Sequence, residues 1–515
     1  MGLTLDACIL ILKEHHLLKS SAVQDKVSQK FTSASYDSRQ VTANTLFFCK
    51  GENFRPIYLE MAKNNGATVY VAEQPYAEGK GMHALIVRNI RKAMALLAAA
   101  FYDFPQDDLF VIAYTGTKGK TTSAYFTKGM LDRVNDGHTA MSSTVERVLG
   151  PKPEQHIASE LTTPESLDLF RDMRTAVDNG MTHLAMEVSS QAYKKNRVFG
   201  LTYDVGFFLN ISPDHIGPNE HPTFADYLHC KLQLLVNSRK CVINAETDYF
   251  NEVYAAATIT TEPDSVYLFA SADFPAPEGV KIDFRYQSEE ADLSKSRFKL
   301  TAGTLKAEQL RITGEYELDL IGDYNESNAC AAIIGAGLAG ATYPDTAKGI
   351  ANVQIPGRME KLDIPGHGRV YVDYAHNYAS MVALLSFLKK EYQQPRILVV
   401  VGSPGDKGVS RREGFAKALN QLAQRAFITN DDPGFEEPID IANQIVAGID
   451  PQKVKVTIEL DRAEAIELAI TESQPGDIVV LAGKGSDDEQ KVRGVNTPWP
   501  TDMAVAKAVA ARLRG

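Results

Sequence analysis

The apolar residues of this 515-residue chain fall into short β-branched runs that alternate with longer helical patterns. Such alternation is typical of α/β domains built on parallel sheets. The first hundred residues predict short strands at 45–49 and 67–71 and a helix at 90–102, and a Phe-Pro pair at 104–105 then breaks the pattern. We therefore expect the first domain to be an α/β domain that covers residues 1–107.

A second domain is expected at 108–355. Its buried strands alternate with helices, as in a parallel sheet. Between residues 265 and 320 the pattern changes to alternating apolar and polar positions, which indicates antiparallel hairpins added to the parallel core. The predicted elements are strands at 109–114, 182–188 and 204–211, a helix at 122–134, and a closing Ala- and Gly-rich helix at 325–339.

The remaining residues, 356–515, repeat a strand–loop–helix unit and predict a Rossmann-like third domain. No GxGxxG fingerprint accompanies its strands, so a dinucleotide is not implied. The overall prediction is an α/β protein of three domains, the second built on a parallel sheet with a phosphate loop. The predicted strands of the third domain are 370–373, 396–401, 425–429 and 478–481.

Net charge, cysteine spacing and the length of apolar stretches argue against several classes of protein. The formal net charge is −11, which leaves no basic surplus to neutralise nucleic-acid phosphates. The five cysteines form no CxxC pair, so neither a zinc site nor a disulfide framework is indicated. No stretch approaches the roughly 20 apolar residues that span a bilayer. We expect a cytoplasmic protein that binds neither nucleic acid nor membrane.

The segment TGTKGKTT at 115–122 lies between a predicted buried strand and a predicted helix. Glycines let backbone N–H groups turn toward anionic oxygens, and the helix N-terminus adds positive potential. Lys120 is then expected to reach the terminal phosphates of ATP and Thr121 to bind Mg²⁺. The alternative is an ordinary glycine-bearing turn, since Tyr114 stands where the full phosphate-loop pattern has glycine. The flanking strand and helix favour ATP.

Two further segments follow buried strands and can contribute metal ligands. Glu187 ends the strand of MEVSS, and His215 lies in NISPDHIG after the next strand. Alone, a strand-end glutamate is more often solvated or capping, and a lone histidine is usually structural. Because the carboxyl ends of parallel strands meet at one sheet edge, the phosphate loop favours a Mg²⁺-binding role for both.

Ordered motifs resemble the Mur ligases, the ATP-dependent amide-forming enzymes that build the peptidoglycan stem peptide. The resemblance covers nearly the whole chain. Its DSR, EVSS and D-x-P motifs are most similar to the branch that adds a diamino acid to UDP-N-acetylmuramoyl-L-alanyl-D-glutamate. Besides the two loops above, the motifs are YDSRQV (36–41), LTTPES (161–166), RVFG (197–200), DYLHCKLQLL (226–235), DYNESNACAA (323–332), PGRMEKL (356–362), VDYAHNYASM (372–381), DDPGFEEP (431–438) and AGKG (482–485).

The resemblance implies a UDP-sugar domain, a central ATPase and a lid that carries the amino-acid site. It also implies roles for residues that match the family motifs. Lys231 matches the lysine that becomes carbamylated and so gains a metal-binding carboxylate, which makes Lys120, Glu187, His215 and Lys231 the catalytic set. The metal set is Thr121, Glu187, His215 and Lys231. The ATP set is Thr115, Gly116, Thr117, Lys118, Gly119, Lys120, Thr121, Thr122, Asn325, Arg358 and His376. The UDP-substrate set is Ser38, Thr162, Thr163, Ser189 and Arg197.

The implied chemistry is acyl-phosphate formation with ATP and Mg²⁺. The substrate carboxylate attacks the γ-phosphate, and the amine of the amino acid then displaces phosphate. Small molecules are the only partners expected, namely the UDP-muramoyl dipeptide and a diamino acid, and we expect a monomer.

The amino acid is predicted from a departure in the D-x-P motif. Relatives that add meso-diaminopimelate carry Asp-Asn-Pro-Arg, whereas this chain reads Asp-Asp-Pro-Gly at 431–434 and surrounds it with acids. A negative pocket favours an ammonium-tipped side chain, so L-lysine is predicted first and L-ornithine second, with meso-diaminopimelate as a further alternative. A solvated acidic run is the ordinary alternative reading. The predicted amino-acid set is Arg412, Asp431, Asp432, Gly483 and Asp487.

Two other functions compete. A folylpolyglutamate-type amide ligase shares the fold but lacks the N-terminal segment that carries DSR. A nucleotide-regulated binding module without catalysis would lack Lys120, Glu187 or Lys231, all of which are present.

Overall fold

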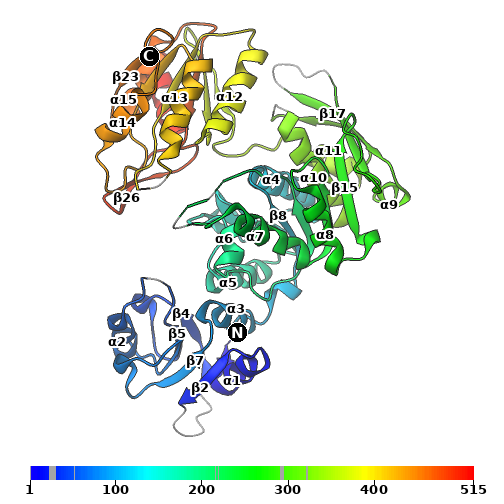
Figure 1. Cartoon of the computed structure of the whole chain (residues 1–515), viewed down its shortest axis with the longest axis vertical. Coiled ribbons are helices and arrows are strands. Elements are labelled where there is room, and N and C mark those ends of the chain that lie inside the picture. The colour runs from blue at the N-terminus through cyan, green and yellow to red at the C-terminus, as the bar shows by residue number, and fades with distance from the viewer. Residues whose placement is uncertain are drawn as a thin grey trace. The chain divides into compact units, whose positions relative to one another are not determined.

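The computed structural model describes residues 2–22, 30–51, 53–214, 216–217, 220–289, 295–320, 323–406 and 408–514. The chain divides into two compact units (Figure 1). Unit 1 runs to Val353, and unit 2 consists chiefly of Gln354–Gly515. Residues 1–107 cluster with the residues that follow them in unit 1, so the domain boundary near residue 107 stays a prediction, as does the one at 355.

A five-stranded sheet forms the N-terminal part of unit 1, in the order β2-β7-β6-β5-β4. Its strands are parallel except β2, which runs antiparallel to β7. Strand β5 is buried on both faces, as expected for a parallel strand covered by helices. The strands are β2 (Leu18–Ala22), β4 (Ser33–Ser35), β5 (Thr45–Phe48), β6 (Val69–Ala72) and β7 (His83–Val87), with a separate pair β1 (Leu3–Thr4) and β3 (Lys30–Phe31). The helices are α1 (Leu5–Glu14), α2 (Pro56–Asn64) and α3 (Ile90–Phe101).

The rest of unit 1 is built on an eleven-stranded sheet in the order β11-β10-β9-β12-β8-β13-β14-β15-β16-β17-β18. The seven strands in the middle of this order, β9-β12-β8-β13-β14-β15-β16, are parallel, whereas β10 joins β9 and β17 joins β16 antiparallel. The strands are β8 (Phe110–Thr115), β9 (Thr139–Ser142), β10 (Glu146–Val148), β11 (His156–Ala158), β12 (His183–Glu187), β13 (Tyr203–Phe208), β14 (Ser238–Asn244), β15 (Val266–Ser271), β16 (Phe284–Ser288), β17 (Ser296–Ala302) and β18 (Gly314–Leu318). The helices are α4 (Lys120–Val134), α5 (Ser166–Asp178), α6 (Ser190–Lys194), α7 (Phe224–Val236), α8 (Phe250–Thr260), α9 (Leu305–Glu308), α10 (Asp323–Leu338) and α11 (Tyr343–Ile350).

The parallel sheet with an antiparallel addition was predicted, but three of its parallel strands, β9, β14 and β15, were not. Strands β9 and β14 carry buried polar side chains, including Thr139, Ser142 and Ser238, so they lack the continuous apolar run that marks a core strand. Strand β15 lies in the segment read as hairpins, yet it runs parallel to both neighbours. Helix α4 packs against α10 and α11 beside the sheet (Figure 1).

Unit 2 contains a six-stranded sheet in the order β19-β20-β24-β21-β22-β23, parallel except for β19. Two apolar clusters cover its faces, as a Rossmann-like fold requires. The strands are β19 (Glu360–Leu362), β20 (Arg369–Asp373), β21 (Ile397–Val401), β22 (Arg425–Ile428), β23 (Lys455–Ile458) and β24 (Ile478–Ala482), with a hairpin of β25 (Glu489–Val492) and β26 (Val495–Pro498). The helices are α12 (Tyr378–Glu391), α13 (Ser410–Leu422), α14 (Pro438–Val446), α15 (Arg462–Glu472) and α16 (Asp502–Arg514).

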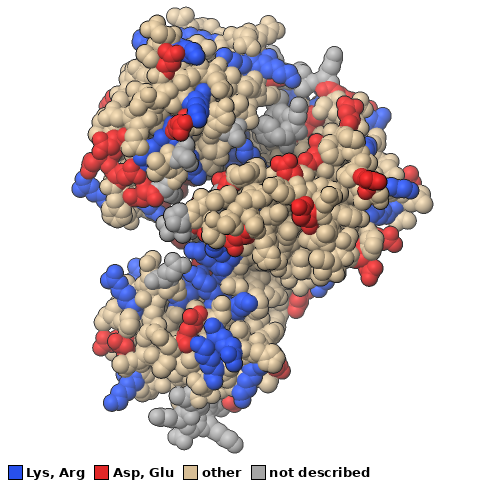
Figure 2. Space-filling model, in the orientation of Figure 1, with Lys and Arg blue, Asp and Glu red and all other residues tan. Residues whose placement is uncertain are grey.

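Among the described residues, no helix is both long and apolar enough to cross a membrane. Figure 2 shows acidic and basic side chains interspersed over the face in view. The multi-domain α/β class predicted from the hydrophobic pattern is confirmed.

Candidate active site

The predicted phosphate loop connects β8 to α4. Strand β8 reads FVIAYT and is almost wholly buried, so the loop starts from the middle of the sheet. Gly119 precedes the helix with a φ of +89°, a conformation that favours glycine. A Cβ there would lie 2.1 Å from Asn328 Oδ1 of α10. The GKT segment is therefore set by backbone conformation and by close packing against α10.

The loop is held by hydrogen bonds to the segment after β13. Asn210 accepts a bond from the Lys118 backbone N–H at 2.9 Å and donates one to its carbonyl at 3.0 Å. The Thr117 hydroxyl lies 3.0 Å from the backbone nitrogen of Ser212 and 3.1 Å from the Tyr227 hydroxyl. Lys120 folds back, with Nζ 2.8 Å from the Gly116 carbonyl oxygen. The loop is thus closed around its own lysine.

The Glu187 carboxylate sits at the end of β12, next to β8, and is only 1% exposed. Its Oε1 accepts bonds from the Thr121 hydroxyl at 2.8 Å and from the Thr144 backbone N–H at 2.7 Å. Its Oε2 accepts a bond from the Thr144 hydroxyl at 3.1 Å. The structure therefore brings together two predicted metal ligands, Thr121 and Glu187.

The donor set around Glu187 suits a divalent cation. A buried carboxylate is normally paired with a positive group. In the described part of the chain, no ion pair joins Glu187 to a lysine, arginine or histidine, and only neutral donors contact it. Hydroxyl and carboxylate oxygens are the ligands that Mg²⁺ prefers. Thr121 and Glu187 thus fit the predicted metal site.

Lys231 lies on α7 and is 2% exposed. Its Nζ donates a bond of 2.7 Å to the Gly116 carbonyl, which Lys120 also contacts, and lies 4.7 Å from the Tyr227 ring centre. Burial and the positive charge of Lys120 lower the pKa of the Lys231 amine well below its usual range. Two lysines therefore converge on one carbonyl of the phosphate loop.

His215, predicted as a metal ligand, lies outside the described residues. The neighbouring His221 is buried, with Nδ1 2.6 Å from Asp226 Oδ2 and Nε2 2.9 Å from the Ser190 hydroxyl. Both of its ring nitrogens are therefore engaged by protein groups.

Four of the five predicted UDP-substrate residues lie beside the end of β12 and are called the substrate strip: Thr162 and Thr163 from before the strand, Ser189 and Arg197 from after it. Thr163 donates to the Glu187 carbonyl at 3.0 Å and accepts from the Ser189 backbone N–H at 3.1 Å. Arg197 contacts the Thr163 carbonyl at 3.2 Å and Glu165 at 3.1 Å. The fifth member, Ser38, is buried and lies in the N-terminal part of unit 1.

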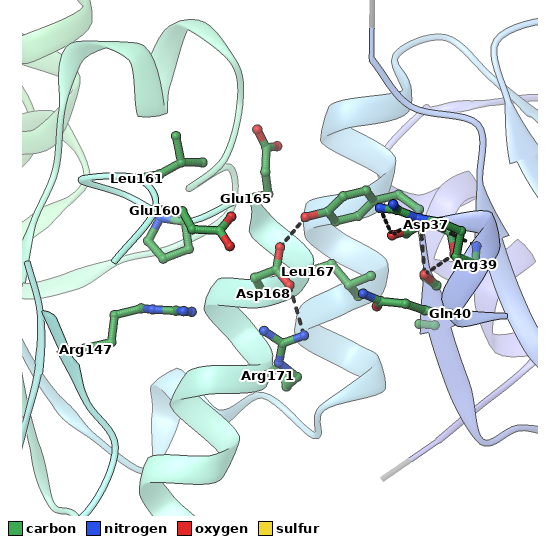
Figure 3. Close-up of a pocket in the computed structure, with 14 residues that line it drawn as sticks. Asp37, Arg39, Gln40, Arg147, Glu160, Leu161, Glu165, Leu167, Asp168 and Arg171 are labelled. Carbon is green, nitrogen blue, oxygen red and sulfur yellow. Dashed lines mark hydrogen bonds and ion pairs between the residues drawn. The ribbon is translucent and has the colours of Figure 1, made fainter. Parts of the chain in front are cut away.

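A pocket of about 410 Å³ lies between the DSR segment and the start of α5 (Figure 3). Asp37 and Arg39 line it from one side and Asp168 and Arg171 of α5 from the other. Tyr36 spans the gap with a hydrogen bond to Asp168. The DSR motif predicted this region, but α5 was missed because its contribution arises from long-range packing.

The predicted ATP set is divided between the units. Thr115–Thr122 and the buried Asn325 of α10 belong to unit 1. Arg358 and His376 belong to unit 2, where the Arg358 guanidinium lies over the Tyr374 ring at 5.1 Å.

In unit 2, Arg412 of α13 is 3% exposed. Two of its nitrogens each donate a 2.9 Å bond to Glu436, and a third contact of 2.7 Å reaches Gln444. Its Nε is buried and makes no hydrogen bond to the described residues. An incoming carboxylate would therefore compete with Glu436 for this guanidinium.

The acids after β22 and β24 surround the buried Lys484. Its Nζ lies 2.9 Å from Asp432 and 3.6 Å from Asp431. Gly483 faces Asp431, because a Cβ at that position would lie 2.9 Å from its Oδ2. Burial raises the pKa of Asp431, and withdrawal of water raises the pKa of Asp487 to about 6. The predicted negative pocket thus contains its own cation.

Known proteins resemble the chain throughout. Residues 114–336 match the Mur ligase middle domain, and residues 357–485 match the Mur ligase, glutamate ligase domain. A UDP-N-acetylmuramyl-tripeptide synthetase of Lactobacillus acidophilus is 67% identical and covers 100% of this chain and 99% of that protein. The UDP-N-acetylmuramoyl-L-alanyl-D-glutamate–L-lysine ligase of Enterococcus faecalis is 49% identical over 94% of this chain and 93% of its own.

Solved structures share the fold. A UDP-N-acetylmuramoyl-L-alanyl-D-glutamate–2,6-diaminopimelate ligase aligns over 100% of both chains with a TM-score of 0.65 and 22% identity. A folylpolyglutamate synthase of Mycobacterium tuberculosis, solved with ADP and AMPPCP, covers 82% of this chain and 95% of its own with a TM-score of 0.57 and 18% identity. On the two domain matches and the full-length relatives, the chain belongs to the Mur ligase family.

Proposed function

We propose that this chain is an ATP-dependent ligase that joins L-lysine to UDP-N-acetylmuramoyl-L-alanyl-D-glutamate during cytoplasmic peptidoglycan precursor synthesis. The full-length tripeptide synthetase relatives and the L-lysine ligase of Enterococcus support this reaction. The observation that carries it is the buried Glu187 carboxylate bonded to Thr121 of the phosphate loop. That pair provides the oxygen ligands that a Mg²⁺–ATP complex requires.

The reaction has two balanced steps. The glutamyl carboxylate attacks the γ-phosphorus of ATP, the bond to the β-phosphate oxygen breaks, and an acyl phosphate and ADP form. The amine of lysine then attacks the acyl carbon, loses a proton and expels inorganic phosphate. Bound Mg²⁺ would neutralise charge on the transferring phosphoryl group. Thr121, Glu187, His215 and carbamylated Lys231 are the proposed ligands.

The phosphate loop and the substrate residues are proposed to bind different parts of the two substrates. Lys120 exchanges its contact with the Gly116 carbonyl for the terminal phosphates of ATP. The backbone N–H groups at 116–122 and the N-terminus of α4 bind the remaining phosphate oxygens. Thr163, Ser189 and Arg197 hold the UDP-linked dipeptide beside Glu187, where its carboxylate can approach the phosphoryl group.

Lys231 is proposed to react with CO₂. Carbamylation needs a neutral amine, and burial next to Lys120 lowers the pKa of Lys231 in the required direction. The carbamate adds a negative charge to a site where two lysine side chains meet at one carbonyl.

Selection of lysine is proposed to rest on Asp431 and Asp487. Position 434 is glycine with a φ of +60°, so no arginine is present there to bind a distal carboxylate. Glu436 and Glu437 pair with Arg412 and Arg493, which removes them from direct recognition of the ammonium group.

The test is phosphate release from ATP with UDP-N-acetylmuramoyl-L-alanyl-D-glutamate and L-lysine, L-ornithine or meso-diaminopimelate added separately. We expect turnover with lysine to exceed that with either competitor, and the tripeptide product to be detected by mass. Turnover with diaminopimelate above lysine contradicts the specificity, and no turnover with any of the three contradicts the reaction. A folate substrate offered with glutamate tests the folylpolyglutamate alternative. Gel filtration tests the proposed monomer.

A further inference from the structure

Thr144 lies between the proposed metal site at Glu187 and the proposed UDP-substrate residue Thr162. It lies in the turn between β9 and β10 and is exposed. Its hydroxyl lies 3.1 Å from Glu187 Oε2 and 3.1 Å from the Thr162 hydroxyl, and its backbone N–H donates to Glu187 Oε1 at 2.7 Å. One residue thus contacts both the proposed metal ligand and the proposed substrate strip.

The direction of these bonds follows from the protons available. A threonine hydroxyl carries one proton, and an ionised carboxylate only accepts. Thr144 therefore shares its one proton between two acceptors, Glu187 Oε2 and the Thr162 hydroxyl. Thr121 and Thr144 thus both donate to Glu187, and the carboxylate accepts every one of these bonds.

We propose that Thr144 is a positioning residue that orients Glu187 for Mg²⁺–nucleotide binding and links it to Thr162. The inference rests on the proposed function. The N–H and the hydroxyl of Thr144 hold both oxygens of the carboxylate, which fixes the rotation of the carboxyl group. Thr121, the other donor, is itself a proposed metal ligand. Thr144 is the donor that orients the carboxylate without being a proposed ligand.

The Thr144 hydroxyl is a hydrogen-bonding group that the proposed nucleotide site and the proposed UDP-substrate site have in common. A substrate that takes over Thr162 leaves the Thr144 proton to Glu187 alone, which strengthens the bond to the carboxylate. Nucleotide binding and UDP-substrate binding are therefore expected to strengthen one another, and equally in both directions.

The test compares Thr144→Val, which keeps the shape and the N–H, with Thr144→Ser, which keeps the hydroxyl. Binding of the non-hydrolysable analogue AMPPCP to the full chain is measured by calorimetry over a range of Mg²⁺ concentrations. We expect T144V to raise the Mg²⁺ concentration for half-maximal binding about tenfold and T144S to stay within about twofold of wild type. The strengthening by UDP-N-acetylmuramoyl-L-alanyl-D-glutamate is expected to disappear in T144V only.

The matched control is Thr346→Val, which removes a buried hydroxyl of α11 that contacts Tyr316 at 2.8 Å. It is expected to lower the unfolding midpoint without changing the Mg²⁺ requirement. If T144V does not fold, Thr144→Ala removes the same hydroxyl and carries the same expectation.

Three outcomes are decisive. Equal Mg²⁺ requirements in wild type and T144V overturn the inference, as does a T144S protein as impaired as T144V. A wild-type chain that binds no Mg²⁺–AMPPCP overturns the proposed function itself. The two failures are distinguishable because the first leaves wild-type binding intact.

Discussion

Two buried carboxylates in this chain have opposite surroundings. Within the described residues, Glu187 in unit 1 contacts only the neutral donors of Thr121 and Thr144. Asp502 in unit 2, fully buried at the start of α16, receives bonds of 2.7 and 2.6 Å from the equally buried Arg462. The Asp502 charge is neutralised by an arginine, whereas no ion pair to Glu187 is present among the residues that the structure describes.

The difference separates structural from functional charge. A carboxylate paired with a buried arginine holds elements together, because loss of one partner leaves an uncompensated charge. A carboxylate with only neutral donors gains its counter-charge from a ligand. The pair Arg412–Glu436 lies between these cases, because the arginine is buried and its partner is half-buried near the proposed amino-acid site.

The largest effect is expected from Glu187→Gln. Glutamine can keep hydrogen bonds to Thr121 and Thr144 but removes the charge, so phosphate release should fall about 100-fold or more. The free energy of unfolding should not decrease, since a buried charge is removed. Steady-state rates and urea unfolding measure the two quantities. The control E252Q, at an exposed position on α8, should match wild type; a loss of stability in E187Q without loss of activity would reverse the comparison.

Asp502→Asn is expected to show the opposite pattern. It leaves Arg462 buried beside a neutral partner and should lower the free energy of unfolding by about 3 kcal/mol. The rate per folded molecule should change far less than in E187Q, because the pair bonds the backbone beside the proposed amino-acid site and not the proposed metal ligands. Thermal or urea unfolding measures the loss, with the exposed D440N as a matched control. An unchanged unfolding curve would contradict a structural role.

The smallest effect is expected from Asp487 of the proposed amino-acid site, and it concerns the pH dependence of the KM for L-lysine. The pKa of Asp487 is raised to about 6, with burial as the largest cause, so the carboxyl is charged above that pH and neutral below it. Only the charged form attracts an ammonium group. The KM for L-lysine should therefore rise as pH falls below about 6, approaching tenfold per pH unit. D487N should have a higher KM with no such slope; a slope that survives in D487N assigns it to another group.

Prediction from sequence worked best where function is encoded in consecutive residues. The strand–loop–helix order around Lys120 and the strand end at Glu187 are recovered in the structure. Thr144 was missed because it follows β9, whose polar residues hide a core strand. The acids around the D-x-P motif were predicted to form a negative pocket, and the structure pairs two of them, Glu436 and Glu437, with arginines.

The sequence alone determined the α/β class, the phosphate loop and the identity of the charged groups, because hydrophobic period and local motifs involve neighbouring residues. Only the tertiary structure decided which of those charges are already neutralised. Arg462 and Asp502 are 40 positions apart, and Thr121 and Glu187 are 66 apart. Pairing over such separations depends on sheet order and burial, which no local pattern contains.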